Sequence, residues 1–137
     1  MRLLLLVAVL LAADPWTEKD LMQPGEVAAH LKGPLVIHVG FNVLYRAAHI
    51  PGSEYAGPGS KAEGIELLKK AVAGQPKDRE IVLYCGCCPW EKCPNIRPAF
   101  AALHEMGFSK VRVMVVPKDF KTDWDDKGYP TEKRAAE

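Results

Sequence analysis

The sequence predicts a single α/β domain in which helices cover both faces of a central parallel β-sheet. Three apolar runs rich in β-branched residues are expected to be buried strands, at residues 35–39, 79–85 and 110–116. Segments with helical periodicity separate these runs, and strands that alternate with helices form parallel sheets through right-handed crossovers. The chain has 137 residues, of which 48% are apolar, so it is long enough to bury one core.

Three segments around the strands have the spacing of amphipathic helices. They are residues 23–31, 61–74 and 95–108, and each ends near a glycine. Asn95 is the expected N-cap of the third helix, because a short polar side chain can accept a hydrogen bond from a free N–H of the first turn. Residues 40–60 contain repeated Pro and Gly, which predicts an irregular segment.

The N-terminus has the composition of a secretory leader. One positive charge precedes an unbroken apolar run from Leu3 to Ala13, which is too short to span a bilayer and matches the core of a signal peptide. We expect residues 1–13 to be the leader, residues 14–22 a linker and residues 23–137 the domain. Export would place the protein in the periplasm or outside the cell, where cysteines can form disulfides.

The charge balance argues against a polyanionic partner. Eighteen basic and seventeen acidic residues give a net charge of +1, and no basic stripe with interleaved aromatic residues is present. We therefore expect no nucleic-acid partner, no membrane association once the leader is removed, and a monomer.

All four cysteines lie within nine positions at the end of the second predicted strand. They are Cys85, Cys87, Cys88 and Cys93. Ligands of parallel sheets bind beyond the carboxyl ends of the strands, and Cys85 lies at such an end with a helix N-terminus after its loop. Gly86 is expected to allow unusual backbone angles directly after it. The position of this loop predicts that it is the active site.

The three cysteines after the first have two possible roles. They could form a disulfide, in one of two ways: Cys87 or Cys88 could bridge to Cys93 as a brace for the loop, or these thiols could resolve an oxidised Cys85. Alternatively, four thiolates could hold zinc, an iron–sulfur cluster or Cu(I). The spacing C-x-C-C-x4-C lacks the two separate C-x-x-C hairpins of a zinc ribbon. We therefore favour the disulfide and expect no metal and no cofactor.

Several segments together resemble the rhodanese-like sulfurtransferase domain family. "LVIHVG" followed by "YRAAHIPGS" is similar to a strand of the family and to its Gly-His-Ile-Pro-Gly signature. "REIVLYC" resembles the strand that delivers the catalytic cysteine. "ALHEMGFSKVRVM" and "DWDDKGYP" resemble the following helix-to-strand corner and the closing Trp and Gly-Tyr-Pro. The resemblance covers about residues 23–130 and implies the rhodanese-like fold.

The same resemblance implies a sulfurtransferase with Cys85 as its nucleophile. The Cys85 thiolate would take sulfane sulfur from a thiosulfate-like donor, hold it as a persulfide and pass it to an acceptor. The implied acceptors are a thiol, a cyanide-like molecule or a thiol of a partner protein. The expected substrate-binding residues are Gly86, Cys87, Cys88, Trp90, Lys92 and Arg97.

The chain also departs from the family pattern. His38 and Gly40 stand where the family usually has Asp and Arg, and the loop after Cys85 is longer. We expect His38 to be a core histidine bonded to a backbone carbonyl, His49 to be a structural hydrogen-bonding residue, and Trp90 to be either a lid or an exposed aromatic. Two other functions stay open: a thiol–disulfide oxidoreductase that uses this loop, and a non-catalytic or metal-binding module.

Overall fold

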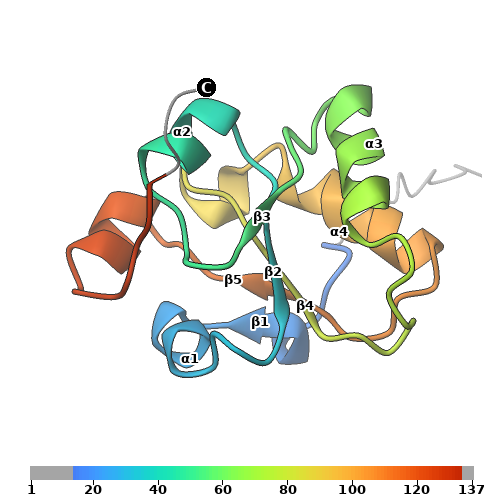
Figure 1. Ribbon diagram of the computed structural model, residues 1–137, viewed down its shortest axis with the longest axis horizontal. Coiled ribbons are helices and arrows are strands. Elements are labelled where there is room, and N and C mark those ends of the chain that lie inside the picture. Colours follow the sequence, from blue (N-terminus) through green and yellow to red (C-terminus); the bar gives the residue numbers. More distant parts are fainter. Residues whose placement is uncertain (1–13, 134–137) are drawn as a thin grey trace, which may run out of the picture.

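The computed structural model describes residues 14–133 and contains a five-stranded parallel sheet with helices on both faces (Figure 1). The strand order is β1-β5-β4-β2-β3, and the pairing is parallel at each step. The α/β fold predicted from the sequence is therefore confirmed. The leader predicted for residues 1–13 lies outside the described residues. None of the helices within residues 14–133 is long and apolar enough to cross a membrane.

The elements follow one another in the alternating order of an α/β domain. The strands are β1 (Leu21–Met22), β2 (Leu35–His38), β3 (Glu54–Tyr55), β4 (Ile81–Tyr84) and β5 (Val111–Met114). The helices are α1 (Pro24–Ala29), α2 (Asn42–Ala47), α3 (Ala62–Ala71) and α4 (Ile96–Glu105). Three short turns of 3-10 or π geometry are η1 (Glu18–Asp20), η2 (Trp90–Lys92) and η3 (Lys121–Asp125).

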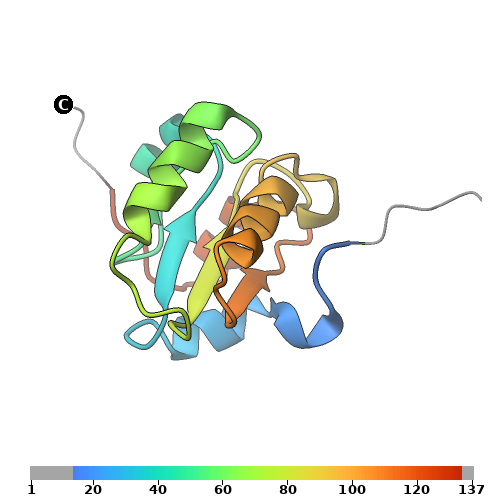
Figure 2. The ribbon, with the colours of Figure 1, turned by 90° about the vertical axis from the view of Figure 1, so that its right-hand side faces the viewer.

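The central strands β2 and β4 are buried on both sides, and their side chains alternate between two cores. Ile37 and Leu83 belong to the core under α3 and α4, which lie together on one face of the sheet (Figure 2). Val82 and Tyr84 belong to the core under α1 and η3 on the opposite face. Burial on both sides explains why these strands have continuous apolar sequences rather than the alternation of a half-exposed sheet.

The packed unit begins before residue 23, which corrects the linker predicted for residues 14–22. Trp16 is 7% exposed, and its ring lies edge-on to that of Phe100 at 5.6 Å between centroids. Leu21 and Met22 pair with β5 and form the edge strand β1. The sequence does not indicate this strand, because two residues are too few to show an alternating pattern.

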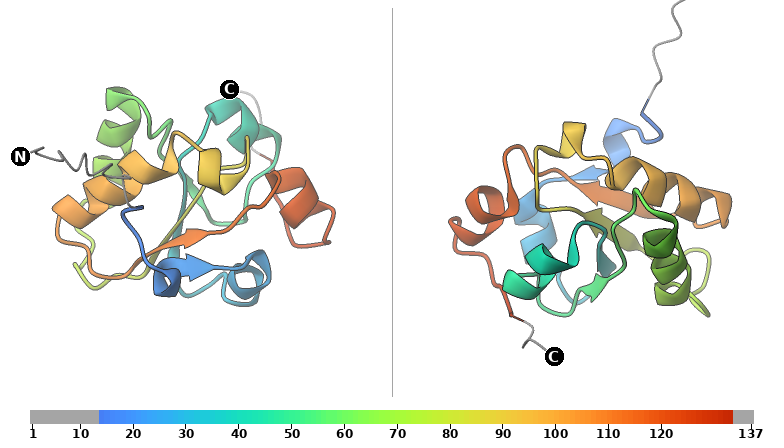
Figure 3. Two further views of the ribbon diagram at one scale, coloured as in Figure 1. Left: turned by 180° about the vertical axis from the view of Figure 1, so that it is seen from behind. Right: turned by 90° about the horizontal axis from the view of Figure 1, so that it is seen from above.

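The sequence predicts an irregular segment at residues 40–60, but only part of this segment is irregular. It contains α2, which begins after Phe41, and the two-residue strand β3. Both elements are shorter than the window in which periodicity can be detected. Together with η2 and η3, α2 surrounds the carboxyl-end edge of the sheet, where the site lies (Figure 3).

Candidate active site

Cys85 lies directly after the carboxyl end of β4, which is the middle strand of the sheet. Its side chain is 2% exposed. The neighbouring strands β2 and β5 pair with β4 on its two sides and fix the position of the strand end. The loop that follows is attached to the end of β5, because the Trp90 N–H donates a hydrogen bond to the Val116 carbonyl at 2.9 Å. The sheet therefore places this thiol at a defined point.

The sulfur atoms of the cysteine loop form a chain of contacts. Cys85 Sγ lies 3.4 Å from Cys87 Sγ, which in turn lies 3.1 Å from Cys88 Sγ. The sulfur atoms of Cys85, Cys87 and Cys93 all lie within 4.8 Å of one another. All four cysteines are free thiols, with Cys93 buried and Cys87 exposed. The disulfide between Cys93 and Cys87 or Cys88 stays a prediction.

These contacts make Cys85 the acidic thiol of the cluster. Its pKa is lowered to about 6, chiefly by a hydrogen bond from the Cys93 thiol and further by the Cys87 N–H and thiol and the Asn95 amide, although burial opposes the shift. The pKa of Cys93 is raised, chiefly by its hydrogen bond to Cys85. The pKa of Cys87 is also raised, chiefly by burial. The arrangement therefore favours a Cys85 thiolate between two protonated thiols.

Asn95 is the site residue that the sequence did not identify. It occupies the N-cap position of α4 as expected, but its side chain makes no capping hydrogen bond. Instead, its Nδ2 donates to Cys85 Sγ at 3.7 Å and its Oδ1 accepts from the Ser60 N–H at 3.1 Å. The side chain is fully buried. An asparagine before a helix has the same sequence signature in both roles, so no sequence signal distinguishes them.

Gly40 and His38 lie against the same thiol. A Cβ atom on Gly40 would lie 2.8 Å from Cys85 Sγ and 2.9 Å from His38 Cε1, so no side chain fits there. His38 Nδ1 accepts a hydrogen bond from the Gly40 N–H at 3.1 Å. Nδ1 is thus an acceptor, and the backbone-carbonyl partner expected for His38 stays a prediction for the other ring nitrogen, since a backbone hydrogen bond of residue 38 also raises the pKa of the ring. The pKa of His38 is lowered to about 3, chiefly by burial and then by His49, which keeps the ring neutral.

The structural role predicted for His49 is confirmed. Its Nδ1 lies 2.6 Å from the Tyr45 carbonyl and its Nε2 lies 3.1 Å from a carboxylate oxygen of Glu132. The backbones of His49 and Glu132 also pair. These contacts attach the C-terminal segment to the end of α2, beside the site.

Three of the predicted substrate-binding residues lie outside the thiol cluster. Arg97 forms an ion pair with Asp14 at 2.7 Å and lies over the Trp16 ring, 5.2 Å from its centroid. Trp90 is half-buried and packs against Trp16 with 5.7 Å between ring centroids, so it is not an exposed ring, and its role as a lid stays a prediction. Lys92 is exposed on η2. Contact of these residues with a substrate stays a prediction.

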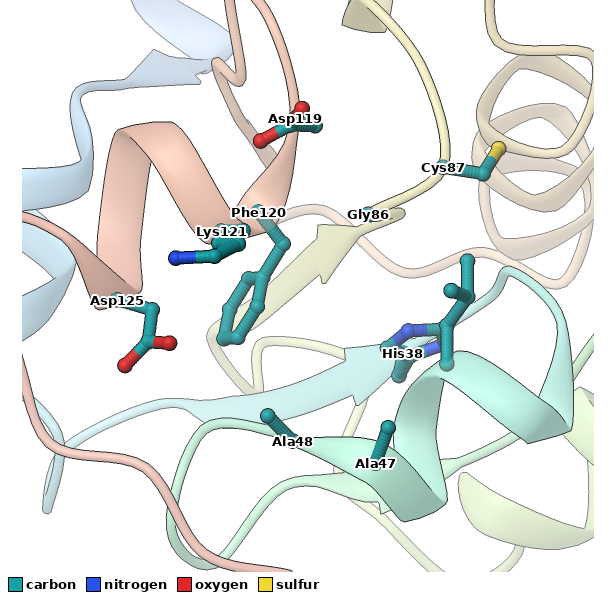
Figure 4. Close-up of a pocket in the computed structure, with 10 residues that line it drawn as sticks. His38, Ala47, Ala48, Gly86, Cys87, Asp119, Phe120, Lys121 and Asp125 are labelled. Atoms are coloured by element: carbon teal, nitrogen blue, oxygen red, sulfur yellow. The ribbon is translucent and has the colours of Figure 1, made fainter.

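A cavity of about 430 Å³ adjoins the cysteine loop (Figure 4). It is lined by Gly86 and Cys87, by small and apolar residues at the end of α2, and by Phe120. Gly86 does not have a positive φ, contrary to the reason expected for a glycine there. A Cβ at this position would lie 2.8 Å from Phe120 Cβ, so the close approach of Phe120 is what requires glycine.

The charged side chains that line this cavity do not form an anion-binding site. Asp119 and Asp125 contribute carboxylates, and Lys121 contributes the ammonium group. The Lys121 ammonium forms an ion pair with Asp126 at 2.7 Å. The cavity therefore has no surplus positive charge, and it suits a neutral or weakly charged molecule better than a polyanion.

Within residues 14–133, the group with a geometry for holding a metal ion is Cys85, Cys87 and Cys93, whose sulfur atoms lie within 4.8 Å of one another. Thiolates are preferred ligands of Cu(I) and are also common ligands of zinc. Cys88 Sγ lies 3.1 Å from Cys87 Sγ but is not one of the three clustered sulfur atoms. The cluster therefore has the donor atoms of a soft-metal site.

Comparisons with known proteins agree with this architecture. No family model matches the chain, and no curated protein matches it. The crystal structure of the Alr3790 protein from Anabaena sp. is 19% identical, with a TM-score of 0.64 over 84% of this chain and 94% of that chain. The solution structure of the rhodanese-like domain of the Alr3790 protein is 20% identical, with a TM-score of 0.60 over 84% and 80% of the two chains.

A longer protein is similar as well. The 3-mercaptopyruvate sulfurtransferase from Leishmania major is 16% identical, with a TM-score of 0.61 over 90% of this chain and 39% of that chain. The parallel sheet, the cysteine at the end of β4 and these structural matches agree with the family resemblance of the sequence. The chain therefore has the fold of the rhodanese-like domains.

Proposed function

We propose that the protein is a sulfurtransferase that moves sulfane sulfur from a thiosulfate-like donor to a thiophilic acceptor through a persulfide on Cys85. The observation that carries the proposal is the environment of this thiol, which is buried at the end of β4 and has its pKa lowered to about 6. Such a thiol is mostly thiolate at neutral pH, and the thiolate is the nucleophilic form. The structural match to a 3-mercaptopyruvate sulfurtransferase supports the same reaction class.

The reaction has two half-reactions. The Cys85 thiolate attacks the outer sulfur of thiosulfate, the sulfur–sulfur bond of the donor breaks, and sulfite leaves with the electron pair. An acceptor thiolate or cyanide then attacks the outer sulfur of the persulfide, and the Cys85 thiolate is the leaving group. The hydrogen bonds from Cys93, Cys87 and Asn95 stabilise that thiolate in the resting site and as the leaving group.

The neighbouring cavity supports a small acceptor. Its volume of about 430 Å³ is in the range of small-molecule pockets, and its lining includes Cys87, whose sulfur contacts Cys85. The absence of surplus positive charge among its lining residues favours a small thiol over a highly charged acceptor.

Release of sulfite tests the proposal. The reduced protein is mixed with thiosulfate under argon, and sulfite is measured against protein. Wild-type protein is expected to release one sulfite per molecule, and Cys85→Ser none. Val43→Ala, which changes a side chain that is 73% exposed and does not line the cavity, serves as the control and should match the wild type. Equal sulfite release from Cys85→Ser and wild type would exclude Cys85 as the nucleophile.

A second candidate function is the binding of a soft metal ion by the three clustered thiols. The separation of the sulfur atoms of Cys85, Cys87 and Cys93 favours it. Elemental analysis of protein purified under argon decides this point. A metal-binding protein would hold about one equivalent of copper or zinc, and Cys93→Ser would lose it. Metal-free protein that still releases sulfite from thiosulfate would support the sulfurtransferase alone.

A further inference from the structure

The contact between Cys85 and Cys87 places a second thiol against the atom that would carry the transferred sulfur. We propose that Cys87 is a resolving thiol: it attacks the Cys85 persulfide, releases hydrosulfide and leaves a Cys85–Cys87 disulfide. A small dithiol reductant then reopens this disulfide. The inference rests on the proposed function, because it begins from the persulfide. It adds an activity in which the protein's own thiol is the first acceptor.

The geometry needs little change for this step. The two sulfur atoms lie 3.4 Å apart, and a disulfide bond is about 2.05 Å long. The two cysteines are separated only by Gly86, a residue type whose backbone adjusts at low cost. Small rotations of the two side chains would bring Cys87 Sγ to Cys85 Sγ without moving the sheet.

The step balances in atoms and electrons. Cys87 Sγ forms a bond to Cys85 Sγ, and the bond between Cys85 Sγ and the outer sulfur breaks. The outer sulfur leaves with the electron pair as hydrosulfide and takes the proton of the Cys87 thiol. In this step the Cys87 sulfur is oxidised and the outer sulfur is reduced, while Cys85 Sγ keeps the oxidation level that it reached in the persulfide. Over both steps the two protein thiols are oxidised, and thiosulfate is the oxidant. The dithiol reductant restores both thiols by exchange and is itself oxidised to a disulfide.

The positions of the other thiols favour Cys87 for this role. Cys93 is 1% exposed, so a disulfide between Cys85 and Cys93 would be closed to a reductant. Cys88 contacts Cys87 and lies outside the trio of sulfur atoms around Cys85. Cys87 both touches Cys85 and is exposed at the cavity beside Gly86 (Figure 4). A small dithiol can therefore reach the Cys87 sulfur.

The experiment follows the fate of one sulfur atom in a single turnover. The fully reduced protein, freed of reductant under argon, is mixed with thiosulfate without an added acceptor. Sulfite, hydrosulfide and the intact mass are measured. Wild-type protein should release one sulfite and one hydrosulfide per molecule and lose the mass of two hydrogens. Cys87→Ser should release one sulfite and no hydrosulfide, and should gain the mass of one sulfur.

The controls separate this inference from the proposed function. Val43→Ala, at a position that is 73% exposed and does not line the cavity, should behave as the wild type. Cys87→Ala repeats the test if Cys87→Ser does not fold. Sulfite release with a stable added sulfur on wild-type protein would overturn the resolving role and leave the sulfurtransferase intact. Hydrosulfide release that persists in Cys87→Ser and is lost in Cys93→Ser would assign the role to Cys93. Protein that releases no sulfite would overturn both proposals.

Discussion

Burial ordinarily raises the pKa of a thiol, because desolvation disfavours the thiolate. Cys85 is 2% exposed, and yet its pKa is lowered to about 6. Hydrogen bonds from Cys93, Cys87 and Asn95 outweigh the desolvation. At the scale of single residues, the reactivity of Cys85 therefore depends on neighbours that donate to its sulfur and on the space that Gly40 leaves beside it.

Replacing Asn95 by alanine removes one donor to the thiolate. A hydrogen bond to a charged group contributes about 1.5 kcal/mol, so the pKa of Cys85 should rise by about one unit. The pH dependence of alkylation by iodoacetamide, followed on the Cys85 peptide, measures this shift. Asn42→Ala, an exposed position at the start of α2, is the control and should leave the profile unchanged. An unchanged profile in Asn95→Ala would contradict the donor role of Asn95.

Gly40→Ala tests the space beside the thiol. The added methyl would lie 2.8 Å from Cys85 Sγ, and overpacking of this kind costs about 1–3 kcal/mol. We expect slower sulfite release and a lower free energy of unfolding in urea. Gly33→Ala is the matched control, because its Cβ would meet only the His30 carbonyl at 3.8 Å. Wild-type sulfite release by Gly40→Ala would show that the thiol tolerates a neighbour there.

At the scale of elements, the N-terminal segment belongs to the core. Trp16 packs on Phe100 of α4 and on Trp90 of the cysteine loop. Trp16→Ala should lower the free energy of unfolding by about 3–5 kcal/mol, as measured by urea denaturation. Val43→Ala, which removes a side chain that is 73% exposed, should change it by less than about 0.5 kcal/mol. Similar free energies of unfolding for the two variants would contradict the core role of Trp16 and support the view that residues 14–22 are a linker.

The sequence predicts those elements whose pattern is long enough to read. β2, β4 and β5 are continuous apolar runs, and α1, α3 and α4 lie in segments with helical spacing, so all six are expected and found. β1, α2 and β3 are too short for a pattern, and tertiary pairing alone defines them.

The residues of the site also fall into those that the sequence predicts and those that it does not. The place of Cys85 follows from the end of its strand, whereas the donor role of Asn95 and the engagement of Arg97 with Asp14 depend on contacts between distant segments. Such contacts leave no local trace in the sequence. For the same reason, the sequence leaves open which thiol lies closest to Cys85.

At the scale of the whole molecule, the parallel sheet brings distant segments to one thiol. The end of β2 supplies His38 and Gly40, the end of β4 supplies Cys85, and the start of α4 supplies Asn95. The neutral His38 also packs against β4: the centroids of the His38 and Tyr84 rings lie 4.9 Å apart. Protonation of the buried ring should therefore affect the stability of the whole fold.

Lowering the pH from 6.5 to about 3 should destabilise the protein through His38. The pKa of His38 is about 3 in the folded protein against an ordinary value of 6.5, so between these values the unfolded chain binds a proton that the native state excludes. The free energy of unfolding should then fall by up to about 1.4 kcal/mol per pH unit. Urea denaturation at several pH values should show a smaller slope for His38→Gln. The exposed His30→Gln should keep the wild-type slope, and equal slopes in all three proteins would contradict this account.

The most direct test of the central claim locates the transferred sulfur. Reduced Cys87→Ser protein is mixed with thiosulfate under argon, its free thiols are blocked, and the peptide that spans the cysteine loop is sequenced by mass spectrometry. The account predicts one added sulfur on Cys85, with one sulfite released per molecule. An added sulfur on Cys88 or Cys93, or a folded protein that releases no sulfite, would contradict it.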